Sequence, residues 1–236
     1  MEKIILHIGM PKAGSTSIQE FLKINTKELL DRNYFIPNFY GSGVNSWPLT
    51  FPFMNKKKFN NKKRRLYHLD LSIEITQENL LNYYEEKFQN FKEKYSKKIL
   101  LTSSEDFFGE LKTSCEIKSF QSFINKIFDS VEIILYIRNP LSKAISCLSE
   151  NVKQGRLKNE LNKSDIPLYS YKKYLTHWLE CFPGAKFQLA LFQEEDLYRK
   201  NLIIDFNQRI GLVSKAKSFD YKVENTSLNY KAICVL

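Results

Sequence analysis

The chain has 236 residues, 43% hydrophobic and 26% charged, with a formal net charge of +10. This length predicts one domain, residues 1–236, with a sizeable core. No apolar run approaches the roughly 20 residues of a membrane-spanning helix, and the first strand is predicted so close to Met1 that we expect no signal peptide. The positive charge favours anionic partners. Four scattered cysteines indicate free thiols in the cytoplasm rather than disulfides or a zinc site.

The N-terminal stretch predicts a strand, a tight loop and a helix. Residues 4–8 form a near-continuous apolar run, typical of a strand covered on both faces. From Ser17 onwards the apolar residues fall on one helical face: Ile18, Phe21, Leu22, Leu29 and Leu30. Gly9 and Gly14 permit a sharp turn between the two elements. Because the first N–H groups of a helix are unpaired, this turn predicts a phosphate or sulfate site.

The position of the lysine separates this loop from a nucleotide-triphosphate P-loop. A P-loop has Gly, four residues, then Gly-Lys-Ser/Thr, but here Ser15 follows Gly14 and the lysine stands at position 12. The segment resembles the 5′-phosphosulfate loop of sulfotransferases, which use 3′-phosphoadenosine 5′-phosphosulfate (PAPS). The resemblance implies that one run of residues binds the nucleotide: Pro11, Lys12, Ala13, Gly14, Ser15, Thr16 and Ser17.

The rest of the chain alternates predicted strands and helices. We expect strands at residues 33–37, 98–104, 131–137 and 186–192. We expect helices at residues 76–95, 117–128, 139–152, 169–182 and 197–210, and a helix cap near 224–228. This order predicts an α/β, P-loop-like, three-layer fold, in which a central, mainly parallel sheet is flanked by helices.

Two segments ahead of the predicted helix at 76–95 leave alternatives open. Residues 38–55 are irregular and rich in aromatic side chains, which indicates either core packing from a loop or the wall of a substrate cleft. The segment from Lys56 to Arg65 has seven basic residues in ten. It is either a solvated, mobile loop or a patch for an acidic acceptor or an anionic membrane surface, the latter at the inner membrane face. No recognition motif accompanies the charge, so we expect no nucleic-acid binding.

A second polar cluster follows the strand predicted at 131–137. Arg138 stands at the carboxyl end of that strand, where open α/β sheets bind ligands. Asn139 and Pro140 then open a helix. That helix has serines on one face, at 142, 146 and 149, and an apolar face expected to pack, with Ala144, Ile145, Leu148 and Val152. A guanidinium beside hydroxyls suits a phosphate dianion, although a pair with a nearby carboxylate is a fair interpretation of Arg138 alone.

This stretch also resembles the sulfotransferases. Their 3′-phosphate site has an Arg at the strand end, commonly followed by Asn-Pro, and a Ser eight residues after the Arg, which here are Arg138 and Ser146. The resemblance implies that Lys12 neutralises the leaving phosphate oxygen, following the logic of phosphoryl transfer, and that no metal is needed. It further implies PAP as the product and, from bacterial relatives, a sugar or glycolipid hydroxyl as the acceptor.

The acceptor hydroxyl needs a general base within hydrogen-bond reach. Glu105 is the first candidate because it follows a predicted strand at the carboxyl edge of the sheet, although a carboxylate there also favours the start of a helix. His68 is the second candidate, and His7 is expected in the core.

The chain departs from the family pattern in three places. Asn45 lies in the region where many bacterial relatives carry a His, and Ser17 stands where animal-type enzymes carry the Trp that stacks on adenine. The C-terminal Arg-Lys-Gly contact is absent, and residues 225–227 are the candidate replacement.

Two other functions fit parts of the sequence. A P-loop kinase would need a carboxylate for Mg²⁺, for which Asp106 is the candidate, but Ser15 in place of the P-loop lysine argues against it. A non-catalytic protein that binds anions or membrane surfaces would use residues 56–65.

Overall fold

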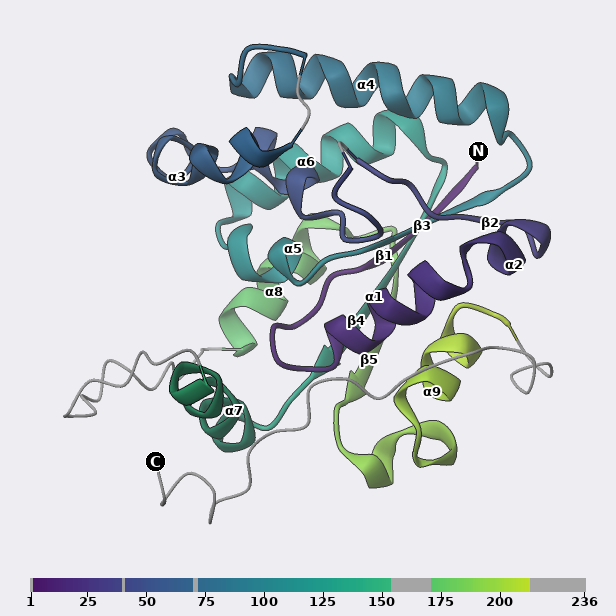
Figure 1. The fold of residues 1–236 in the computed structure, drawn as a ribbon, viewed down its shortest axis with the longest axis vertical. Helices are drawn as coiled ribbons and strands as arrows, with labels where there is room; N and C mark the ends of the chain where they lie inside the picture. Colours follow the sequence, from purple (N-terminus) through teal and green to yellow (C-terminus); the bar gives the residue numbers. More distant parts are fainter. Residues whose placement is uncertain (1, 40, 70–71, 154–170, 213–236) are drawn as a thin grey trace.

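The computed structural model describes residues 2–39, 41–69, 72–153 and 171–212 (Figure 1). Within them one five-stranded sheet has the order β2-β3-β1-β4-β5, and every pair of neighbouring strands is parallel. The strands are β1 (Lys3–His7), β2 (Tyr34–Phe35), β3 (Ile99–Ser103), β4 (Ser130–Ile137) and β5 (Lys186–Leu191). The predicted α/β fold with a parallel central sheet is confirmed.

Helices cover both faces of the sheet. On one side lie α1 (Ser15–Ile24) and α9 (Leu202–Arg209), and on the other α4 (Gln77–Lys94), α6 (Ser114–Ile127) and α8 (Tyr171–Cys181) (Figure 1). The shorter or peripheral helices are α2 (Thr26–Asp31), α3 (Lys56–Lys62), α5 (Glu105–Glu110) and α7 (Pro140–Lys153). Single 3-10 segments are η1 (Trp47–Phe53), η2 (Lys63–His68), η4 (Glu194–Asp196) and η5 (Tyr198–Lys200). In the part of the chain that is described, no helix has both the length and the hydropathy to cross a membrane.

β1 forms the centre of the sheet because its residues are apolar on both faces. Ile5 is fully buried and pairs with Leu101 of β3 and with Glu132 of β4. His7 is also fully buried, and its Nδ1 lies 2.8 Å from Oγ of Ser103. Burial lowers the pKa of His7 to about 3, so the imidazole is neutral at physiological pH. The expectation that His7 belongs to the core is confirmed.

Two predicted helices have different limits in the structure. The first begins at Ser15, ahead of the predicted Ser17, and ends at Ile24, so Leu29 and Leu30 belong to the separate helix α2. Asn25 interrupts it by donating from Nδ2 to the carbonyl oxygen of Phe21, at 2.9 Å.

Near the C-terminal side of the sheet, the helix predicted at 197–210 begins only at Leu202. The side chain of Asn201 caps it by accepting from the backbone N–H of Ile203 and Ile204. The predicted apolar face of α7 is packed at Ala144 but 45% exposed at Ile145, so that expectation is only partly correct. The predictions for residues 224–228 and 225–227 lie outside the described residues.

The basic segment 56–65 is folded, so the expectation of a loop is wrong. It forms α3 and the start of η2, and it packs on the acidic residues of α5 and α6. Its ion pairs are Lys58–Glu116 at 2.9 Å, Lys62–Glu110 at 2.5 Å and Arg65–Asp106 at 2.9 Å. Within the described part of the chain, three of its seven basic side chains are therefore paired with carboxylates.

The aromatic segment before it, residues 38–55, packs mainly in the core, and the alternative of a substrate-cleft wall stays a prediction. Phe39, Phe51 and Phe53 are buried in the core. Trp47 is half-buried and lines a concavity described below. Among the described aromatic residues of this segment, three are therefore buried and Trp47 alone is half-buried.

Glu116 holds the junction between the basic segment and α6. Its side chain is 3% exposed, and it accepts hydrogen bonds from the Asn55 and Thr113 backbones and from Lys58. Burial alone would raise the pKa of Glu116, but these hydrogen bonds outweigh burial and lower the pKa to about 2.

We expect Glu116→Gln to lower the free energy of unfolding by about 2 kcal/mol at pH 7, because hydrogen bonds to a charged group are lost. The folded pKa is depressed from 4.5, so this contribution is complete above pH 4.5 and disappears as the pH falls through about 2. Urea unfolding of wild type and variant at pH 7 and pH 3 measures this contribution to the free energy of unfolding, and Glu93→Gln, at an exposed position, is the control. A difference between wild type and Glu116→Gln that is as large at pH 3 as at pH 7 would contradict the assignment.

Candidate functional site

The carboxyl ends of β3, β1 and β4 lie side by side, since His7 pairs with both Ser103 and Ile134. Parallel strands end at the same edge, which is where ligands bind in open α/β sheets. β1 continues into the loop from Gly9 to Gly14, β3 into Glu105, and β4 into Arg138. The loop, the candidate base Glu105 and the candidate phosphate-binding residue Arg138 therefore all follow strands that end at this edge.

The loop after β1 is compressed between neighbouring segments. Gly9 and Gly14 have φ of +103° and +82°, which other residues rarely adopt. A Cβ on Gly9 would lie 2.8 Å from Cα of Glu105, and a Cβ on Gly14 would lie 2.9 Å from the ring of Phe192. Lys12 also has a positive φ, 69°. Glycine is therefore required at both ends of the loop by backbone angle and by space.

The N-terminus of α1 has no side-chain cap. Its N-cap is Gly14, and α2 likewise has no side-chain cap, whereas α3, α4, α5, α6 and α9 are capped by the side chains of Asn55, Thr76, Ser104, Thr113 and Asn201. The first amides of α1 are therefore available to an anion, and the helix dipole favours negative charge there.

The other predicted loop residues surround this helix start in different ways. Ser15 is buried, and its Oγ donates to the carbonyl oxygen of Met10 at 3.4 Å. Thr16 is exposed, Pro11 and Ser17 are half-buried, and Ala13 is fully buried. A ligand would therefore meet Ala13 through its backbone.

Arg138 joins the turn after β4 to the loop after β1. Its Nη1 donates to the carbonyl oxygen of Lys12 at 2.7 Å, and its guanidinium lies 5.5 Å from the ring centroid of Phe192. Burial lowers the pKa of Arg138 from its ordinary value. The two motifs singled out from the sequence therefore meet at one edge.

Helix α7 adds charges that sequence reasoning missed. Nζ of Lys12 forms an ion pair with Glu150, one turn beyond the half-buried Ser146 on the same face. Lys143 is 3% exposed, and burial lowers its pKa to about 8. The i, i+4 spacing from Ser146 was the available signal for Glu150, whereas nothing in the sequence marks Lys143, because lysines on helices are usually solvated.

Glu105 is the first residue of α5 and lies against the loop. Its Oε2 accepts from Nε2 of Gln19 at 2.8 Å, and Oε1 of Gln19 accepts from Nδ2 of Asn45 at 3.2 Å. Asn45 also forms an isolated parallel bridge with Ser103 of β3. Asn45 is thus connected to Glu105 through Gln19, a residue that the sequence analysis missed.

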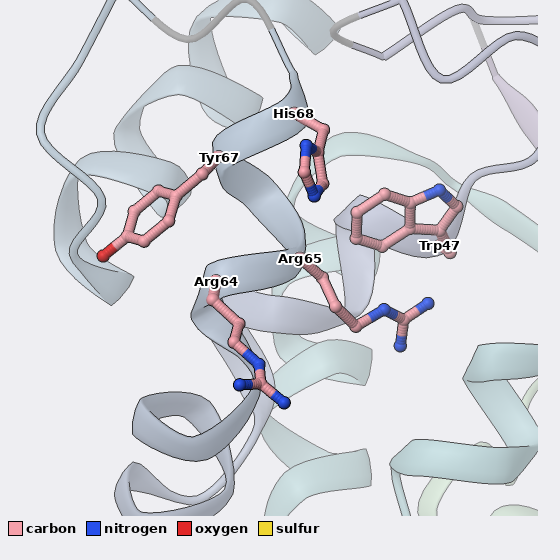
Figure 2. A pocket seen from close by; sticks show the side chains of 5 residues that line it. All are labelled: Trp47, Arg64, Arg65, Tyr67 and His68. Atoms are coloured by element: carbon pink, nitrogen blue, oxygen red, sulfur yellow. The ribbon is translucent and has the colours of Figure 1, made fainter.

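His68, the second candidate base, lies apart from this network. It lines a concavity of about 520 Å³ together with Trp47, Arg64, Arg65 and Tyr67 (Figure 2). Its ring makes no hydrogen bond to another described residue.

Asp106, the candidate magnesium ligand of the kinase hypothesis, is paired with a cation. Its Oδ2 accepts from Nη2 of Arg65 at 2.9 Å. Burial raises the pKa of Asp106, and Arg65 offsets only part of that rise. Within residues 2–39, 41–69, 72–153 and 171–212, no group of three or more His, Cys, Asp or Glu side chains is arranged to hold a metal ion.

Comparisons with known proteins place the fold. No family model matches the chain. An uncharacterized protein of Archaeoglobus fulgidus is 27% identical over 126 residues, which cover 51% of this chain and 33% of that relative, so the match spans about a third of the relative's length.

Two solved structures are similar. One is the sulfotransferase from Alicyclobacillus acidocaldarius, with a TM-score of 0.52 and 13% identity, covering 98% of this chain and 88% of that one. The other is the sulfotransferase domain from the curacin biosynthetic pathway, with a TM-score of 0.46 and 13% identity, covering 92% and 76%. At the identity of the first match the likeness concerns the fold, and the chain has a sulfotransferase-like α/β fold.

Proposed function

We propose that the chain transfers a sulfuryl group from PAPS to a hydroxyl, with a sugar or glycolipid as acceptor. The observation that carries the proposal is the 2.7 Å hydrogen bond from Arg138 to the Lys12 carbonyl. It holds two cationic residues at the uncapped start of α1, as a nucleotide with phosphates at both ends would require. The likeness in fold to the Alicyclobacillus sulfotransferase supports it.

The residues present fit the donor. The amides at the start of α1 would hold the 5′-phosphate, and Arg138 with Ser146 would hold the 3′-phosphate. The bound donor supplies the sulfuryl group and leaves as PAP. The Lys12 ammonium then neutralises the charge that grows on the leaving oxygen.

Glu105 is the proposed general base that removes the proton from the acceptor. Gln19 holds its Oε2, while Oε1 accepts no hydrogen bond from the described residues. The acceptor oxygen forms its bond to sulfur as its proton passes to Oε1 of Glu105. His68 stays a second candidate, at the concavity beside Trp47.

The Glu150 carboxylate pairs with the Lys12 ammonium, the group that would face the nucleotide phosphate in this proposal. A nucleotide phosphate would therefore compete with this carboxylate. Both side chains are partly exposed, at 29% and 44%, so breaking this ion pair costs little free energy.

We expect PAP to raise the melting temperature of the protein, because a ligand that binds only the folded state stabilises it. Thermal shift with PAP, and in parallel with ATP–Mg²⁺, measures this. Stabilisation by ATP–Mg²⁺ and not by PAP would contradict the proposal and favour the P-loop kinase hypothesis.

Lys12→Ala is expected to reduce turnover by about two decades or more, because a donor aimed at developing charge contributes roughly 3–4 kcal/mol. Stability should barely change, since the pair with Glu150 is partly exposed. Labelled PAPS with a panel of glycan acceptors measures turnover, and Lys23→Ala on the exposed side of α1 is the matched control. Wild-type turnover in Lys12→Ala would remove Lys12 from the mechanism.

Glu150→Gln should bind PAP several-fold more tightly than wild type, because the amide no longer competes for the Lys12 ammonium. Calorimetric titration with PAP measures the affinity. Glu180→Gln, on the exposed face of α8, is the control for the loss of one negative charge. Weaker binding of PAP to Glu150→Gln would show that the carboxylate supports the site.

A further inference from the structure

The concavity lined by Trp47, Arg64, Arg65, Tyr67 and His68, here termed the Trp47 pocket, is unused by the nucleotide site. Its volume is about 520 Å³, within the size range of small-ligand sites. Figure 2 shows the Trp47 indole beside the His68 ring, with the Arg65 guanidinium directed past the indole. The pocket thus combines aromatic surfaces with two arginines.

The Trp47 pocket adjoins the side of the sheet edge that delivers Glu105. Arg65 pairs with Asp106, the residue next to Glu105. The backbone N–H of Trp47 donates to Oδ1 of Asn45 at 3.1 Å, and Asn45 is bonded to Gln19, the partner of Glu105. Since β3 and β4 flank β1 on opposite sides, Asp106, the partner of Arg65, and Arg138 follow strands on opposite sides of β1.

The arginines in the pocket are suited to an oxyanion. Arg65 is held in place by Asp106, and its guanidinium lies 4.6 Å from the ring centroid of Trp47. Only its Nη2 has a hydrogen-bond partner among the described residues, so further N–H donors are available. Arg64 is exposed and forms no ion pair within the described part of the chain. Guanidinium groups bind carboxylate and sulfate through paired hydrogen bonds.

We propose that the Trp47 pocket is the acceptor subsite and that it takes a saccharide carrying a carboxylate or sulfate. The sugar ring packs on the rings of Trp47 and His68, which lie beside one another in Figure 2, and its oxyanion binds Arg64 and Arg65. This inference rests on the proposed sulfuryl transfer, because it assigns the pocket to the acceptor side of that reaction. A flat lipid surface fits less well, because three basic side chains of residues 56–65 are already paired and the arginines flank a concavity.

Tryptophan fluorescence of the full chain tests the subsite without PAPS. The chain has two tryptophans, and Trp178 is fully buried, so a ligand in the pocket changes the emission of Trp47. The probes are a glucuronate-containing disaccharide, a sulfated disaccharide and neutral cellobiose. We expect saturable binding of at least one acidic disaccharide and at least about fivefold weaker binding of cellobiose.

The variant is Arg64→Gln, with Lys57→Gln as the matched control, because Lys57 is exposed and lies outside the pocket. Arg64→Gln should weaken binding of the acidic disaccharide by about fivefold and leave binding of cellobiose unchanged, whereas Lys57→Gln should change neither affinity. Arg65 is left intact, since its removal would leave the half-buried Asp106 carboxylate without its partner.

Three results would overturn the inference. The first is equal affinity for acidic and neutral disaccharides, and the second is an equal effect of Lys57→Gln and Arg64→Gln. The third is the absence of saturable binding to either acidic probe. In that case, co-sedimentation of the wild type, but not of Arg64→Gln, with phosphatidylserine vesicles would assign the arginines to a membrane surface. If PAP binds but the acidic preference is absent, only the subsite assignment fails. If PAP fails to bind, the proposed function fails, and with it the acceptor role of the pocket.

Discussion

The hydrogen bond from Arg138 to the Lys12 carbonyl depends on pairing with β4 that continues beyond the end of β1. The N–H of Met10 donates to the carbonyl oxygen of Tyr136, and the N–H of Tyr136 donates to that of Gly9, at 3.2 and 3.1 Å. The loop is therefore fixed to β4 until two residues before Arg138. A shift of one residue in this register would turn the guanidinium to the other face of the sheet and separate the two motifs.

The same edge is supported from the side of α9. Tyr136 donates from its hydroxyl to Asp205 at 2.7 Å, and Asp205 is paired with Arg209. Burial would raise the pKa of Asp205, but the hydrogen bonds from Arg209 and Tyr136 outweigh it, so the carboxylate stays charged. This buried network holds α9 against β4, and Leu202, the first residue of α9, lies against Gly14.

The elements that were predictable from sequence carry local signals. The strands are dense apolar runs, and the glycine spacing with the displaced lysine marks the loop. The reach of Arg138 to Lys12 follows from both lying at strand ends. The folding of residues 56–65 depends on carboxylates more than 40 residues away, such as Glu110 and Asp106, so it was not visible locally. The contacts of Glu150, Lys143 and Gln19 likewise depend on how helices meet at the sheet edge, which no local pattern encodes.

Gln19 illustrates what this edge demands of a single side chain. One end of its amide accepts from Asn45, and the other end donates to Glu105. A carboxylate of the same shape would offer two acceptors and repel Glu105, and a lysine would leave Asn45 without an acceptor. Position 19 therefore tolerates neither its isosteric acid nor a base, although a helix position facing a polar region would ordinarily accept either. The orientation of the Gln19 amide therefore fixes which group donates and which accepts in both hydrogen bonds that connect Asn45 to Glu105.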